Sequence, residues 1–67
     1  MMNVTINGEP REVPAGTTVE QLVRQVTSQD KGIAAALNGE VLPHRAWSTH
    51  ALADRDQVEV VTAVQGG

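Results

Sequence analysis

Two Asn-Gly dipeptides, Asn7-Gly8 and Asn38-Gly39, each stand between short runs of residues that can form strands. Asn-Gly readily supplies the two positive φ angles of a type I′ turn, the tight connection of a β-hairpin. The sequence therefore predicts two hairpins, one near the N-terminus and one in the middle of the chain. Their predicted strands are residues 3–6, 9–13, 33–37 and 40–42.

Two of these strands carry further information. Pro10 cannot donate a ladder hydrogen bond, so strand 9–13 is predicted to lie at a sheet edge. The run 33–37 contains three alanines, which favour a helix. It is short, however, and it leads directly into an Asn-Gly turn, so a strand is the better prediction.

A helix is predicted to begin at Thr17-Thr18-Val19-Glu20, which has the pattern of a capping box. In this interpretation the Thr17 hydroxyl accepts from the third helical amide, and Glu20 reaches back to the amide of Thr17. Apolar residues then recur at helical spacing and form one stripe. Burial of each such side chain contributes about 1.5 to 3 kcal/mol, so the stripe contributes on the order of 6 to 12 kcal/mol before chain entropy is subtracted. The stripe consists of Val19, Leu22, Val23 and Val26.

Residues 58–64 are rich in β-branched side chains and are predicted to form the last strand, with Val58 and Val60 on the face toward the core. The connection 44–56 is polar and is expected to contain one short helical turn. Its Trp47 is predicted to fill the core with its indole N–H satisfied. A helix packed across one face of a mixed sheet of four or five strands would bury the stripe and the strand faces together, which is an α+β architecture.

Composition limits the possible functions. A chain of 67 residues forms one domain, 1–67, with no room for a separate catalytic domain. Without cysteine it has no disulfide, no thiolate zinc site and no nucleophilic thiol of its own. A net charge of -3 argues against a nucleic-acid partner. The sequence has neither a signal peptide nor a run long enough to cross a bilayer, so we expect no membrane association and a cytoplasmic location.

The C-terminus is the candidate functional group. Residues 65–67 are expected to form a flexible tail, because Gly66 and Gly67 impose almost no steric limit on the backbone. An ATP-dependent enzyme can convert a terminal carboxylate to a mixed anhydride, provided that the tail can be threaded into a covered active site. Two glycines suit that passage. The alternative is that the dipeptide is simply a frayed end.

Other candidate sites are weaker. His44 and His50, with Asp54 and Asp56, match no familiar zinc spacing, so no metal site is expected. Ser48, His50 and Asp54 could be cast as a triad, but nothing indicates an oxyanion hole or a substrate cleft. We therefore expect no catalytic residue.

Val61 and Val64, where they face outward, are candidates for an apolar docking patch beside the tail. The body of the domain must supply much of any partner affinity, because binding has to offset the ordering of the tail, about 1 to 2 kcal/mol per residue.

Three sequence segments together resemble the ThiS family of thiamine-biosynthesis sulfur carriers, and the resemblance covers essentially the whole chain. The segments are Ala36 to Trp47, Asp54 to Val60 and the terminal Gly66-Gly67. The resemblance implies a ubiquitin-like β-grasp fold whose last strand is central in the sheet and parallel to the first. It also implies that the protein is not an enzyme but a co-substrate of other enzymes.

The resemblance further implies roles for the two terminal glycines. A ubiquitin-activating-like enzyme would use ATP and magnesium to adenylate the Gly67 carboxylate, which would become a thiocarboxylate. The carrier itself would bind no cofactor. A cysteine desulfurase or a sulfurtransferase would supply the sulfur, and thiazole synthase would accept it. Gly66 would be threaded beside Gly67. From their position near the reactive end, Gln65, Val64 and Val61 are also expected to contact the partners, and the Val64-Gln65 step departs from the family pattern.

Two alternative functions remain open at this stage. The chain could carry sulfur to another acceptor, such as molybdopterin synthase, or it could be a ubiquitin-like protein modifier or interaction module. The length of the chain and the segment from Asn38 to Trp47 favour thiamine biosynthesis.

Overall fold

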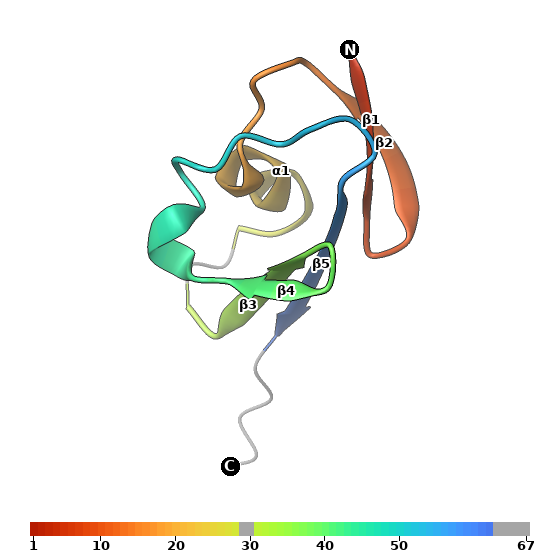
Figure 1. Ribbon diagram of the computed structural model, residues 1–67. Helices are drawn as coiled ribbons and strands as arrows, with labels where there is room; N and C mark the ends of the chain where they lie inside the picture. The colour runs from red at the N-terminus through yellow and green to blue at the C-terminus, as the bar shows by residue number, and fades with distance from the viewer. Residues whose placement is uncertain (29–30, 63–67) are drawn as a thin grey trace.

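The computed structural model describes residues 1–28 and 31–62 (Figure 1). One helix packs across a sheet, and every predicted strand and the predicted helix are present. The elements are β1 (Met2–Ile6), β2 (Glu9–Val13), α1 (Val19–Val26), β3 (Ile33–Leu37), β4 (Glu40–Leu42), a 3₁₀ turn (His44–Ala46) and β5 (Gln57–Thr62). The predicted end of the last strand, residues 63 and 64, and the predicted flexible tail, 65–67, lie outside the described residues.

Within the described residues, the sheet has five strands in the order β2-β1-β5-β3-β4. β5 is central, runs parallel to β1 and pairs with β3 in antiparallel fashion, as the family resemblance implied. β2 is an edge strand, which confirms the prediction from Pro10. Both predicted turns are also confirmed, since the φ angles are 52° and 81° at Asn7-Gly8 and 52° and 88° at Asn38-Gly39.

The ambiguous run 33–37 is a strand because its partners are strands on both sides. β3 pairs with β4 through residues 35–37 and with β5 through residues 33–37. Ala35 is only 2% exposed and faces the core. The alanines therefore allow close packing in a sheet, although their local preference is helical.

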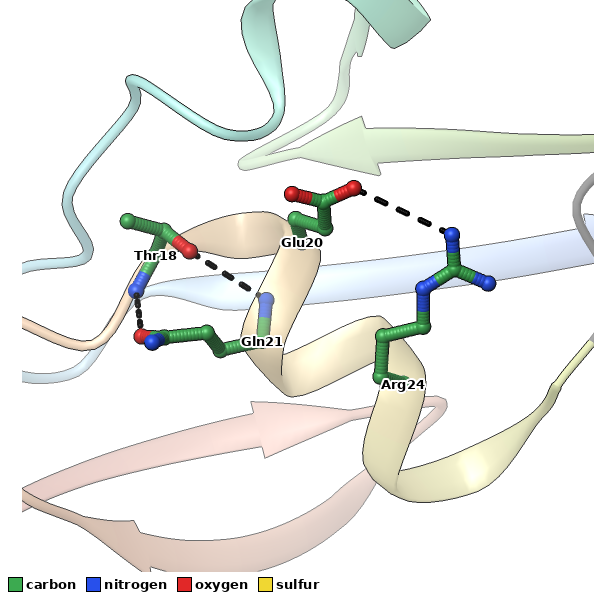
Figure 2. Close-up of polar contacts among 4 residues, drawn as sticks. All are labelled: Thr18, Glu20, Gln21 and Arg24. Atoms are coloured by element: carbon green, nitrogen blue, oxygen red, sulfur yellow. Dashed lines mark hydrogen bonds and ion pairs between the residues drawn. The ribbon is translucent and has the colours of Figure 1, made fainter.

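The helix cap lies one residue later than the sequence pattern predicted. Thr18 is the N-cap: its hydroxyl accepts from the Gln21 amide at 3.2 Å, and its own amide donates to the Gln21 side-chain oxygen at 3.0 Å (Figure 2). The prediction of Thr17 and Glu20 as the capping pair is wrong. A carboxylate oxygen of Glu20 instead lies 3.8 Å from a guanidinium nitrogen of Arg24, one helical turn further along α1.

Tertiary contacts explain the displaced cap. Thr17 is buried, its hydroxyl donates to the Pro14 carbonyl at 2.7 Å, and its carbonyl accepts from the Leu52 amide at 2.8 Å. These bonds hold Thr17 in the turn before the helix. The Thr17 hydroxyl is directed to the Pro14 carbonyl, and the Thr18 hydroxyl is the one that accepts from a helical amide.

We expect Thr18→Ala to lower the free energy of unfolding by about 1 kcal/mol, because it removes the acceptor for an otherwise unpaired helical amide. Thr18→Ser keeps that hydroxyl and is the matched control. Urea denaturation of both variants measures the difference. Equal losses in the two would show that the hydroxyl does not cap the helix.

The core lies between α1 and the inner face of the sheet. Val19, Leu22 and Val23 of the stripe are at most 1% exposed, which confirms three of its four predicted members. Val26 is 39% exposed, so the prediction for this fourth member is wrong. Since α1 ends at Val26 and Thr27 is its C-cap, no following helical turn shields that side chain. The sheet contributes Val4, Ile6, Val13, Ala35 and Val58.

Trp47 closes the core on the side of the long connection. It is 3% exposed, and its indole N–H donates to the Leu42 carbonyl at 3.0 Å. Both parts of the prediction for this residue are confirmed.

No helix in the described part of the chain is long and apolar enough to cross a membrane.

Candidate functional site

The central strand β5 fixes the point from which the C-terminal residues continue. Val58 is 1% exposed in the core, and the strand is bonded to β1 on one side and β3 on the other. Thr62, the last residue of β5, is paired with Ile33 of β3, so the neighbouring strand holds β5 up to this residue. The predicted site residues Val64, Gln65, Gly66 and Gly67 lie outside the described residues.

Side chains of β5 alternate between the core and the outer face of the sheet, the face away from α1. Val58 and Val60 contribute to the core, as predicted, whereas Glu59 and Val61 are exposed. Val61 is 60% exposed. The structure thus places this predicted docking residue on the outer face, close to where β5 ends.

Val61 belongs to a larger apolar surface, here called the outer patch: Ala34, Ala36, Val41 and Val61. The register places Ala34 opposite Val61, and Ala36 opposite Val41. Val41 is 75% exposed and Ala34 is also exposed. Contiguous exposed apolar residues commonly mark interaction sites. Sequence reasoning missed the alanines and Val41, because only the pairing of β5 with β3 and of β3 with β4 brings them beside Val61.

Two asparagines fix β5 from opposite sides. The Asn7 side-chain oxygen accepts from the Val60 amide at 2.8 Å, and the Asn38 side-chain oxygen accepts from the Gln57 amide at 2.9 Å. Each asparagine therefore forms a turn and also continues the hydrogen bonding of the central strand. The sequence signal identified only the turns.

The two carboxylates considered for a metal site, Asp54 and Asp56, accept structural hydrogen bonds. Asp54 accepts from the Asn3 amide at 2.8 Å, and Asp56 accepts from the Ala53 amide at 2.8 Å and from the Asn38 side chain at 3.0 Å. His44 lies against Trp47, with ring centroids 4.3 Å apart. Within residues 1–28 and 31–62, no three His, Cys, Asp or Glu residues are grouped so that they could hold a metal ion.

A five-stranded mixed sheet with parallel β1 and β5 and one helix across it defines the β-grasp class of ubiquitin-like proteins. The sequence profile of the ThiS family matches residues 4–67. The chain belongs to the ThiS family, the sulfur carrier proteins of thiamine biosynthesis.

Individual proteins agree with this assignment. The sulfur carrier protein ThiS of Escherichia coli strain K12 is 30% identical over 66 residues, which cover 98% of this chain and 100% of that protein. The crystal structure of the thiamine biosynthesis protein ThiS from Geobacter metallireducens superposes with a TM-score of 0.82 at 33% identity, covering 98% of this chain and 100% of that one.

A different kind of relative is a thiazole synthase of Paramagnetospirillum magneticum, which is 33% identical over 66 residues. The match covers 98% of this chain but only 20% of that protein. A segment like the present chain is therefore part of a much longer polypeptide there.

Proposed function

We propose that the Gly67 carboxylate is the group that carries sulfur. A ubiquitin-activating-like enzyme joins it to AMP from ATP, with magnesium, and pyrophosphate leaves. The outer sulfur of a persulfide on a cysteine desulfurase or a sulfurtransferase then attacks the acyl adenylate and expels AMP, which leaves an acyl disulfide between Gly67 and the donor enzyme. A second thiol reduces this disulfide, itself becoming part of a new disulfide with the donor enzyme, and the thiocarboxylate is released. The carrier supplies the carboxylate and its position, and the partner enzymes supply the acid-base chemistry and hold the nucleotide and the metal ion.

The central position of β5 is the observation that carries this proposal. A reactive terminus must be presented at a fixed place on a recognisable body, and β5 is paired with β1 at Gln57 and Val58, paired with β3 at residues 58–62, and buried at Val58. The family match also extends to Gly67. Gly66 and Gln65 would pass through the entrance of the partner's active site, and Val64 and Val61 would contact the surface around it.

We further propose thiazole synthase as the acceptor of the sulfur. The relative of that name contains a segment similar to nearly all of this chain. Fusing two domains raises their effective concentration with respect to each other, which is useful when they must meet repeatedly. This favours thiazole synthase over another acceptor.

The test is the intact mass of the protein after incubation with the adenylating enzyme, Mg-ATP and the sulfur donor. We expect a mass gain equal to the exchange of one oxygen atom for one sulfur atom. A protein lacking Gly67 is the control and should show no gain. An unchanged wild-type mass, with the same enzymes active on another carrier, would contradict the proposal. Isopeptide-linked conjugates would favour a protein modifier.

A further inference from the structure

A hollow of about 410 Å³ lies on the outer face of the sheet, over the first half of β5. Thr5, Gln57 and Glu59 line it, and they alternate along their strands with the core residues Ile6 and Val58. Its walls include Gly8 and Gly39, one from each Asn-Gly turn. The hollow is therefore formed where the two hairpin turns approach the central strand from opposite sides.

The walls of the hollow are held in place by hydrogen bonds to β5. The Asn7 side-chain oxygen accepts from the Val60 backbone amide at 2.8 Å, and the Asn38 side-chain oxygen accepts from the Gln57 backbone amide at 2.9 Å. The backbone amide of Asn7 also donates to the Val58 carbonyl at 2.9 Å. Turns that are already held in place lose little backbone entropy when the hollow is filled, which favours binding.

The charge at the hollow is negative. Glu59 is exposed there and forms no ion pair with another residue of the described part of the chain. Thr5 and Gln57 offer further oxygen atoms, and the whole chain has a net charge of -3. A carboxylate beside neutral oxygen acceptors suits a guanidinium or an ammonium group, because such groups have only donors.

The hollow and the outer patch are continuous. Glu59 pairs with Ala36, a member of the patch, and lies two residues before Val61 on the same face of β5. A partner that covers the patch would extend over the hollow.

We propose that the hollow receives an arginine or lysine side chain of thiazole synthase when the carrier docks. This inference rests on the proposed acceptor described above. Glu59 makes the charged contact, the oxygens of Gln57 and Thr5 orient the cation, and the outer patch supplies the apolar part of the interface. The hollow thus gives recognition through residues of β1 and β5 that do not themselves react.

The test compares two neutralising variants, Glu59→Gln and Glu12→Gln, in binding to purified thiazole synthase at low and at high salt. Glu12 is exposed on the outer face of edge strand β2, so its change removes the same charge away from the hollow. We expect Glu59→Gln to raise the Kd about tenfold at low salt and to reduce its salt dependence, with Glu12→Gln close to wild type. Equal Kd values of Glu59→Gln and Glu12→Gln for thiazole synthase at low salt would overturn the proposal.

Thr5→Lys provides a second readout. It places a cation of this chain beside Glu59 and should weaken binding at low salt about as much as Glu59→Gln does. Wild-type affinity in a folded Thr5→Lys protein would also overturn the proposal, as would a wild-type carrier that does not bind thiazole synthase. Thiocarboxylate formation, measured by mass on the wild type, reports separately on the proposed function.

Discussion

Leu22→Ala is expected to lower the free energy of unfolding by about 2 to 5 kcal/mol. Leu22 is 0% exposed between α1 and the inner face of the sheet, so its truncation removes buried apolar surface and leaves a cavity. A domain of this size has a total stability of roughly 3 to 10 kcal/mol. The variant should therefore lose a large share of its stability, and its Tm should fall by at least about 10 °C.

Val26→Ala is the matched control for this experiment. It removes apolar atoms from the same helix at a side chain that is 39% exposed, and it should cost less than about 1 kcal/mol. Urea denaturation followed by circular dichroism gives both values. Similar losses in the two variants would show that packing of α1 on the sheet is not what holds the domain together.

Val61→Asp is expected to weaken binding to thiazole synthase by at least about tenfold, which corresponds to about 1.4 kcal/mol. Val61 is the member of the outer patch nearest the end of β5. If thiazole synthase covered an aspartate there, the carboxylate would lose its hydration, and no cation is assigned to pair with it. Because Val61 is 60% exposed, the free carrier should keep its fold, with a loss of about 1 kcal/mol from the poorer strand preference of aspartate.

Ala15→Asp serves as the control for the added charge. Ala15 is exposed in the turn between β2 and α1, away from the outer face of the sheet. Titration of the partner with each folded variant measures the affinities. Wild-type affinity in Val61→Asp would exclude the outer patch from the interface, and an equal loss in Ala15→Asp would indicate a general effect of charge.

The helix cap shows where sequence reasoning reached its limit. Thr17 and Thr18 are both suitable capping residues, and a glutamate or a glutamine follows each at the required spacing. Two contacts of Thr17 accompany the choice: its hydroxyl donates to the nearby Pro14 carbonyl, and its carbonyl accepts from the amide of Leu52, in a distant part of the chain. No local pattern contains the contact with Leu52, so the predicted cap was one residue too early.

Exposure of the stripe and the outer patch shows the same limit. Helical spacing identified Val19, Leu22 and Val23 correctly, but it could not show that α1 would end before Val26 was covered. Alternation in β5 identified the inward-facing Val58 and Val60. It could not reveal which side chains of β3 and β4 would stand beside Val61.

The sequence by itself determined the two hairpins, the edge position of β2, the helix and the inward face of β5. Each depends on a local property: the φ preferences of Asn-Gly, the missing amide of Pro10, or a short periodic pattern. Only the tertiary structure decided the cap, the outer patch and the hollow between the turns. These depend on hydrogen bonds and strand register between residues far apart in the chain, such as Asn7 with Val60, and no local preference encodes them.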